Sequence, residues 1–131
     1  MKNYFLALAA VILGGGLGAS LRYIICEITA NKFSFLNFPI GILIANLIGC
    51  FLIGFLTFYL TETKASSYTK LFVITGFLGG LTTFSSYAFD SFRLLYQGKI
   101  KLFFFNVFLN NFLGISLAFI GYIFARTLIL K

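Results

Sequence analysis

A stretch of small and hydroxyl-bearing residues, 75–91, interrupts what is otherwise a long apolar segment of the chain. It reads TGFLGGLTTFSSYAFDS, with glycines at 76, 79 and 80 and the run TTFSS at 82–86. Because every backbone polar group in hydrocarbon needs a partner, we expect a span with this centre to be a broken helix buried against protein. Broken helices at the membrane midplane build ion or substrate sites, since their freed carbonyls and helix ends point inward. A plain packing face of small residues is the alternative interpretation.

The composition excludes most other chemistry. The 131 residues have a mean hydropathy of +1.02 and only 10% charged residues, which predicts a single all-α membrane domain, 1–131. Histidine is absent, and only three acids and two separated cysteines, Cys26 and Cys50, remain for metal binding or acid–base work. We therefore expect that the protein is not an enzyme and that the two thiols are buried without a disulfide. The net charge of +7 is scattered singly, so nucleic acid is not an expected partner.

Four apolar segments are long enough to cross a membrane as helices. They cover approximately residues 4–25, 38–60, 71–96 and 102–125. Gly14 and Gly18 in the first form a GxxxG pair, and Gly41, Ala45 and Gly49 recur every fourth residue in the second. Both patterns predict close helix packing, because small residues let backbones approach. We expect a four-helix membrane protein whose third helix is broken near its middle.

A few polar side chains lie inside these spans. Asn46 is the only amide of the second span, where it can hydrogen-bond between helices or line a polar pathway. Asn106 and Asn110, four residues apart, share one face of the fourth helix. Arg22, near the end of the first span, can reach the membrane interface or face an aqueous vestibule.

The basic residues predict how the chain inserts. Four spans place both termini and the middle loop on one side of the membrane. That side carries Lys2, Lys64, Lys70, Arg126 and Lys131, and the opposite side carries Arg22, Lys32, Arg93, Lys99 and Lys101. Since the Lys and Arg bias of short loops sets orientation, this equal count supplies no orientation signal. We therefore expect dual topology and an antiparallel dimer, a two-chain counterpart of the inverted repeats in larger transporters.

Three motifs resemble one known family. They are GGGLGASLRY at 14–23, GILIANLIGCFLIG at 41–54 and GFLGGLTTFSSYAFD at 76–90, and the likeness extends over nearly the whole chain. Together they resemble the Fluc/CrcB fluoride channels, and the GG-x-TTFSS-aromatic segment is the specific part. The resemblance implies an antiparallel dimer in the cell membrane that exports fluoride passively through two narrow pores. Some relatives work only with a related, non-identical chain, so a paralogous second subunit stays open beside the homodimer.

The resemblance also implies roles for single residues. The pore residues that it implies are Arg22 at the vestibule, Asn46, Phe84, Ser85, Ser86, Tyr87 and Asn110. Gly79 and Thr82 would offer backbone carbonyls to a structural sodium ion, Na+, at the two-fold axis, and this ion would not be transported.

The chain departs from the family pattern at several of these positions. Tyr87 stands where relatives have a second pore phenylalanine, and it can serve through its hydroxyl or through its ring edge. Gly114 and Ala118 stand where hydroxyl residues are common, and Ile42 replaces a threonine. The lining of the pore is therefore expected to differ in detail from that of the relatives.

The remaining residue types suit a small, hard anion. An aromatic ring has a positive edge, so rings presented edge-on contact an anion without a full charge. Asn46, Ser85 and Ser86 add ordinary hydrogen-bond donors. Binding must stay weak enough for the ion to leave, and the low charge of the spans agrees with this requirement.

Two other functions compete with a fluoride channel. A proton-coupled small multidrug-type transporter is also a four-span dimer, but it needs an acid deep in a span. Here Glu27 and Asp90 lie near span ends and Glu62 lies in a loop. A non-transporting membrane assembly subunit would explain the glycine faces and leave the TTFSS run without a purpose.

Overall fold

The computed structural model describes residues 3–33 and 37–130, which form helices joined by short turns, with no strand among them. In chain order the elements are α1 Tyr4–Phe33, α2 Ile40–Glu62, α3 Ser67–Lys70, η2 Leu71–Leu78, α4 Gly79–Leu81, α5 Phe84–Tyr96, α6 Ile100–Phe108, η3 Leu109–Leu113 and α7 Gly114–Ile129, where η2 and η3 are π-helical. Elements α3 to α5 together form the third span and α6 to α7 the fourth. Within the described residues, four helices are long and apolar enough to cross a membrane, which confirms the predicted all-α architecture.

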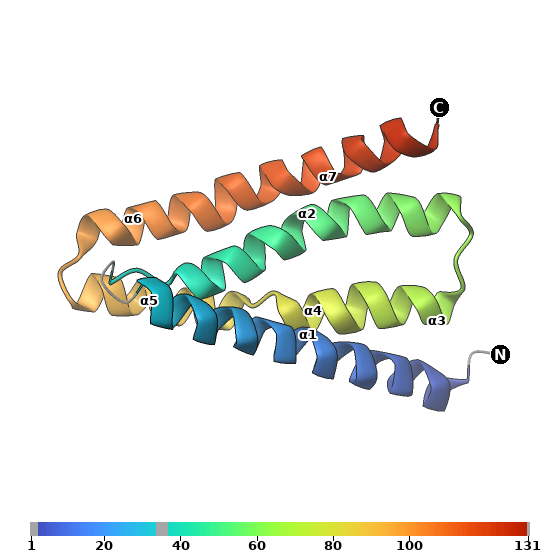
Figure 1. Cartoon of the computed structure of the whole chain (residues 1–131), viewed down its shortest axis with the longest axis horizontal. Helices are drawn as coiled ribbons and strands as arrows, with labels where there is room; N and C mark the ends of the chain where they lie inside the picture. Colours follow the sequence, from blue (N-terminus) through green and yellow to red (C-terminus); the bar gives the residue numbers. More distant parts are fainter. Residues whose placement is uncertain (1–2, 34–36, 131) are drawn as a thin grey trace.

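The four spans lie along one long axis, and successive spans run in opposite directions (Figure 1). The two ends of the chain and the α2–α3 connection lie at one end of the bundle, and the α1–α2 and α5–α6 connections lie at the other. The broadest contacts join α2 to α7 and α1 to η2. Lys2 and Lys131, which complete the predicted charge count, lie outside the described residues.

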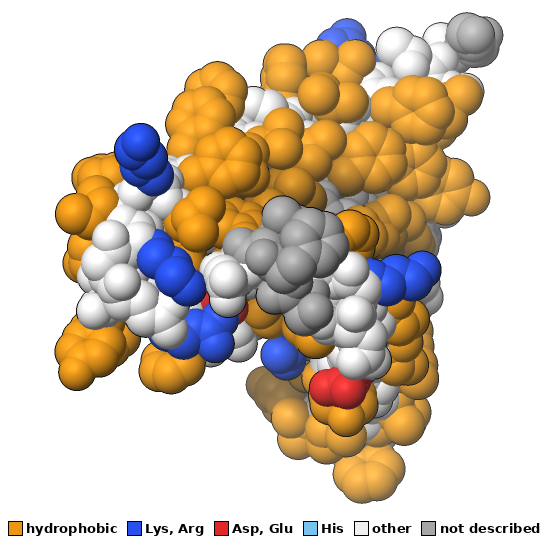
Figure 2. All heavy atoms as spheres, turned by 60° about the vertical axis from the view of Figure 1, so that its left-hand side comes forward, with side chains coloured by type: hydrophobic (Ala, Val, Ile, Leu, Met, Phe, Trp, Pro, Cys, Tyr) orange, Lys and Arg blue, Asp and Glu red, His pale blue; other side chains and the backbone are white. Residues whose placement is uncertain are grey.

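Large apolar side chains cover the flanks of the bundle, as Figure 2 shows for one side. Phe5, Ile12, Phe84, Phe104 and Ile115 are among those that are more than half exposed. Basic side chains gather instead at the end of the bundle that faces forward in this view. Apolar surface on this scale is stable in lipid or against another apolar surface, so the chain is a multi-pass membrane protein.

α1 packs against η2 and α4 backbone to backbone. A Cβ atom on Gly14 would overlap the carbonyl oxygen of Phe72, and one on Gly18 would overlap that of Phe77. Only residues without a side chain permit this approach, which confirms the packing predicted from the GxxxG pair. We call this contact the glycine seam; it consists of Gly14, Gly15 and Gly18 on α1 with Gly76 and Gly80 opposite them.

α1 is longer than the segment 4–25 expected from the sequence, because the helix continues to Phe33. The expected connector has no proline or glycine before Pro39 to end the helix. The Thr29 hydroxyl is satisfied within these extra turns, since its Oγ1 donates to the Ile25 carbonyl at 2.7 Å. The other three spans differ from their expected bounds by at most four residues at either end.

Candidate functional site

The third span is broken at Thr82 and Thr83. Helix α4 ends at Leu81 and α5 begins at Phe84. Both threonines between them have extended backbone angles, with φ −86° and ψ 150° at the first and φ −150° and ψ 123° at the second. The predicted interruption is therefore present, and it falls on the two threonines rather than on the helical glycines 79 and 80 before them.

The threonine hydroxyls bond to the helix backbone on both sides of the break. Thr82 Oγ1 donates to the Leu78 carbonyl at 2.9 Å, and the same carbonyl also accepts from the Thr82 N–H at 3.0 Å. Thr83 Oγ1 accepts from the Ser86 N–H at 3.2 Å, which is the usual N-cap contact of a following helix. A Thr-Thr pair therefore suits a break better than two glycines would, because both hydroxyls find backbone partners and that of Thr83 satisfies an N–H that a helix start leaves unpaired.

Asn46 on α2 satisfies the backbone at this break. Its Oδ1 accepts from the Thr83 N–H at 2.9 Å, and its Nδ2 donates to the Thr83 carbonyl at 3.3 Å. A side-chain amide offers the same donor and acceptor as a peptide unit, so its Oδ1 replaces the helical acceptor that the Thr83 N–H lacks, and its Nδ2 adds a second donor to the Thr83 carbonyl. Asn46 therefore makes the interhelical hydrogen bonds that were one of its two predicted roles.

Hydrogen bonds continue from Asn46 into the fourth span. Asn46 Nδ2 donates to Asn110 Oδ1 at 2.9 Å, and Asn110 Nδ2 donates to Asn106 Oδ1 at 3.0 Å. Asn106, which is fully buried, donates to Ser91 Oγ on α5 at 3.0 Å. We call these four residues the asparagine chain. Because an unpaired amide in hydrocarbon is costly, the asparagine chain ties α2, α5 and the fourth span together.

A hollow of about 350 Å³, here named the central hollow, lies beside the break. Its lining residues are Asn46, Gly49, Cys50, Ile53, Ile74, Leu78, Gly79, Thr82, Thr83, Phe84, Tyr87, Asn110 and Asn111. The hollow thus brings together most of the site residues that the sequence singled out. Arg22, Ser85 and Ser86 do not line it.

Phe84 and Tyr87 present their rings to one another on one face of α5. The ring centroids are 5.5 Å apart and the ring planes meet at 68°, an edge-to-face arrangement. Tyr87 is only 9% exposed, whereas Phe84 is 77% exposed on the single chain. The outer ring is therefore free to contact a ligand, lipid or a second chain.

Ser85 and Ser86 lie beside Thr83, in the first turn of α5. Thr83 Oγ1 is 3.1 Å from Ser85 Oγ and donates to Ser86 Oγ at 3.3 Å. A hydroxyl has one proton, so this bond leaves the proton of Ser86 for another acceptor. The two serines therefore stabilise the start of α5 and keep a donor close to the central hollow.

Arg22 contacts the break and not the end of its own helix. Its Nε donates to the Gly80 carbonyl at 3.1 Å, and the side chain is half-buried. α1 continues well past this position to Phe33, so the arginine does not stand at the end of the span. The bond brings a positive charge to the C-terminal end of α4, where helix carbonyls carry partial negative charge.

The break also releases carbonyl groups that suit a cation. In a continuous helix the Thr83 N–H would donate to the Gly79 carbonyl, but here it donates to Asn46. The Gly79 carbonyl thereby loses its helical donor, at the negative end of α4. Oxygen atoms of this kind fit a hard cation, although two carbonyls from one chain do not complete a coordination shell. Across 3–33 and 37–130, no group of three His, Cys, Asp or Glu side chains could hold a metal.

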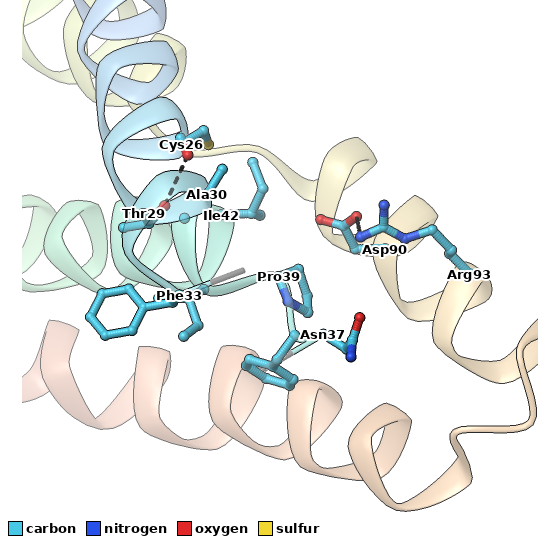
Figure 3. A pocket seen from close by; sticks show the side chains of 12 residues that line it. Cys26, Thr29, Ala30, Phe33, Asn37, Pro39, Ile42, Asp90 and Arg93 are labelled. Carbon is cyan, nitrogen blue, oxygen red and sulfur yellow. Dashed lines mark hydrogen bonds and ion pairs between the residues drawn. The ribbon is translucent and has the colours of Figure 1, made fainter. Parts of the chain in front are cut away.

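A second hollow, of about 370 Å³, lies between α1, the start of α2 and α5 (Figure 3). Asp90 and Arg93 of α5 lie on one side of it and form an ion pair of 3.1 Å. Cys26 and Thr29 of α1 lie across from them. The three-residue spacing of the ion pair is visible in the sequence, but the neighbouring hollow is a product of the fold.

The structure places at the site several residues to which the sequence analysis assigned no role in the pore. They are Thr83, Ser91, Asn106 and Asn111. The four-residue spacing of Asn106 and Asn110 indicated a polar stripe, and it was the one available signal. Asn111 Nδ2 donates to the Tyr87 hydroxyl at 2.8 Å across 24 positions of sequence, a contact that no local pattern reveals.

The fold and site together define a class of protein: a small multi-pass helical membrane protein with a polar break in its third span. Such breaks are typical of proteins that move ions or small solutes. Residues 9–122 match the family model described as CrcB-like protein, Camphor Resistance (CrcB), and the chain belongs to this family.

Curated relatives align with almost the whole chain. The chain is 42% identical over 120 residues to a protein of Aquifex aeolicus (strain VF5), covering 91% of this chain and 96% of that protein. It is 48% identical over 121 residues to one of Clostridium perfringens (strain ATCC 13124), covering 92% and 91%. A third, of Pyrococcus abyssi, is 42% identical over 117 residues, covering 88% and 93%. Each of the three is named fluoride-specific ion channel FluC.

Proposed function

We propose that this protein is a passive, fluoride-selective ion channel that exports cytoplasmic fluoride across the cell membrane. The relatives support the substrate, because they are named fluoride-specific ion channels and align over nearly their full length. They also agree with the expectation that the protein is not an enzyme. The structural observation that carries the proposal is the central hollow, where Asn46, Asn110 and the ring pair meet at the break of the third span.

The break offers an anion several weak donors and no full negative charge. α5 begins at the hollow, and the unpaired N–H groups of its first turn carry partial positive charge. The ring edges of Phe84 and Tyr87 add positive potential, and Ser85 and Ser86 place hydroxyls at the same helix end. Arg22 adds a long-range attraction from the other side of the break. Fluoride exchanges its water for these donors and can leave again, because none of them is a charged group that binds it directly.

The channel is proposed to be an antiparallel dimer, with a homodimer as the simplest form. The balanced Lys and Arg count and the exposure of Phe84 on the single chain support a second copy. A paralogous second chain would meet the same surfaces. Reporter fusions at the C-terminus should show both orientations, and one uniform orientation would contradict the antiparallel homodimer.

A structural sodium ion at the dimer centre is proposed to hold the two chains together. Gly79 and Thr82 would bind it through their carbonyls, and the second copy would supply a matching pair. The support is the lost helical donor of Gly79 at the negative end of α4. The bound ion would offset the partial negative charge of the two helix ends.

The competing functions account for fewer of these features. A proton-coupled multidrug-type transporter needs a free acid deep in a span, whereas Asp90 is paired with Arg93. Glu27 lies six residues before the end of α1. An assembly subunit accounts for the glycine seam and leaves the hydrogen-bonded break and its hollow without a role.

Fluoride efflux from proteoliposomes tests the proposal. Vesicles loaded with potassium fluoride should release fluoride to a fluoride electrode once valinomycin lets potassium follow. The dependence on valinomycin is expected because a passive channel moves charge without a coupled ion. Vesicles loaded with potassium chloride should retain chloride. A multidrug-type transporter or an assembly subunit predicts no valinomycin-dependent fluoride release.

Phe84→Ile tests the aromatic part of the same proposal. It keeps apolar bulk and removes the positive ring edge, so fluoride flux should fall by about tenfold or more, as for a loss of roughly 1.4 kcal/mol of ion stabilisation. Phe119→Ile on α7 is the matched control, since that ring is 65% exposed and does not line the central hollow. Unchanged flux and selectivity in Phe84→Ile would mean that residues 75–91 are only a packing face.

A further inference from the structure

The Tyr87 hydroxyl has a partner on the fourth span. Asn111 Nδ2, in η3, donates to Tyr87 Oη at 2.8 Å, and the same nitrogen donates to the Val107 carbonyl at 2.8 Å. Tyr87 and Asn111 both line the central hollow. The hydroxyl is therefore held at the wall of the hollow by a residue from another span.

The direction of this hydrogen bond is fixed by its neighbours. A carbonyl oxygen only accepts, so the Asn111 atom beside Val107 has to be the amide nitrogen and not Oδ1. That nitrogen has two protons, and the bonds to Val107 and Tyr87 use both. An amide nitrogen does not accept a hydrogen bond, so Tyr87 cannot donate to Asn111. The Tyr87 proton needs another acceptor, and no residue in 3–33 or 37–130 provides one.

The other amides at the hollow have no proton to spare. Asn46 Nδ2 donates to the Thr83 carbonyl and to Asn110 Oδ1. Asn110 Nδ2 donates to the carbonyl and to the Oδ1 of Asn106. The threonine hydroxyls of the lining are also used, one on Leu78 and one on Ser86. Among the amide and hydroxyl groups that line the central hollow, Tyr87 alone keeps a free proton.

We propose that Asn111 is a positioning residue that makes the Tyr87 hydroxyl a hydrogen-bond donor to fluoride in the central hollow. This inference rests on the proposed channel function and adds to it a direct donor and the residue that orients it. The bond from Asn111 also polarises the hydroxyl, because a group that accepts a hydrogen bond becomes a stronger donor. The Phe84 ring lies edge-to-face against Tyr87, so the proton and the ring edges serve the same part of the hollow.

Fluoride currents in planar bilayers, measured against fluoride concentration, test the proposal. Tyr87→Phe removes one oxygen and should raise the half-saturating fluoride concentration about tenfold, the effect expected when a hydrogen bond to an ion is lost. Asn111→Leu keeps the Tyr87 hydroxyl but removes the bond that orients it, so a smaller rise in the half-saturating fluoride concentration, about threefold, is expected. In the Tyr87→Phe background Asn111→Leu should cause no further rise, because the group that it orients is gone.

Tyr122→Phe is the matched control. This tyrosine of α7 packs edge-on against Phe58 and does not line the hollow. The half-saturating fluoride concentration of Tyr122→Phe should therefore equal that of the unmodified protein. Thermal unfolding in detergent, run on every variant, separates loss of folded protein from loss of fluoride binding.

A purely structural link between α5 and η3 predicts a different pattern. The variants would then lose thermal stability and maximal current while the half-saturating concentration stayed constant. That result, or Tyr87→Phe currents equal to those of the unmodified protein, overturns the donor assignment and leaves the channel function standing. An unmodified protein without fluoride current would instead contradict the proposed function itself.

Discussion

The two halves of the third span are held by different kinds of contact. Before the break, η2 and α4 lie on α1 through the glycine seam, where a Cβ on Gly18 would overlap the Phe77 carbonyl. After the break, α5 meets the fourth span through side-chain hydrogen bonds, such as that from Asn106 to Ser91. The first half is therefore positioned by the close approach of two backbones, and the second by a set of directional bonds.

The difference follows from the solvent that surrounds a membrane protein. Lipid is as apolar as a leucine side chain, so helices gain little by burying apolar residues against each other. What remains is close packing, which small residues provide, and interhelical hydrogen bonding, which asparagine provides. The chain uses the first where it needs rigidity beside the break and the second where it needs polar groups around a hollow.

The largest effect is expected at the glycine seam. Gly18→Val would place a Cβ atom on the Phe77 carbonyl oxygen and 2.8 Å from the Leu81 nitrogen, so two backbones would have to separate. Overpacking of this kind costs about 1–3 kcal/mol when side chains can adjust, and a backbone cannot adjust as they do. We expect little folded protein, measured as the monodisperse peak in size-exclusion chromatography in detergent.

Gly16→Ala is the control for this substitution. Gly16 lies in the same helix, and no atom lies within 4 Å of an added Cβ. The yield and the thermal stability of Gly16→Ala should match those of the unmodified protein. Equal yields of Gly18→Val and Gly16→Ala would show that the glycine seam is not required for folding.

A substitution in the asparagine chain should reduce fluoride efflux more than it reduces the amount of folded protein. Asn46→Leu keeps the branched shape of the side chain but leaves the Thr83 N–H without an acceptor, at about 1–3 kcal/mol, and removes the donor to Asn110 Oδ1. The break should then lose its fixed geometry, and fluoride efflux should fall by about tenfold or more while folded protein is still recovered.

Ser116→Ala is the matched polar-to-apolar control for Asn46→Leu. The Ser116 hydroxyl donates only to the Phe112 carbonyl within its own span and does not line the central hollow. Its removal should leave fluoride efflux unchanged. If Asn46→Leu conducted as well as Ser116→Ala, the asparagine chain would be a packing device like the glycine seam.

The sequence predicts the glycine seam more completely than the asparagine chain, for a physical reason. Close packing depends on the small size of residues such as Gly14 and Gly18, and small residues at helical spacing can be recognised within one segment of the sequence. The four spans and the break can also be predicted from the sequence. The spans depend on local hydropathy, and the break depends on the hydroxyls at 82 and 83.

Hydrogen-bond partners cannot be predicted from one segment of the sequence in the same way. Whether Asn46 meets Thr83, 37 positions away, depends on how α2 lies against the third span. The same holds for Arg22, whose contact with Gly80, 58 positions away, depends on how α1 lies against α4. Residue type predicts that a buried amide or guanidinium will find a partner, and only the fold selects which one.

The smallest effect is expected from exchange of the cation, and it separates the two halves most sharply. Replacing sodium on both sides by the larger N-methylglucamine should lower the number of conducting channels severalfold, because the carbonyls of Gly79 and Thr82 would lose the ion proposed to join two copies. The half-saturating fluoride concentration of the remaining channels should not change, since neither Tyr87 nor the asparagine chain is among the proposed ligands of the cation. The two sides of the bilayer can also be given different sodium concentrations, with N-methylglucamine making up the difference. This sodium gradient should not shift the reversal potential of the fluoride current. A shift would mean that sodium is carried with fluoride, and a rise in half-saturation on sodium removal would mean that the cation acts on the anion site directly. Either result would contradict the division of the third span into a structural half and a fluoride-binding half.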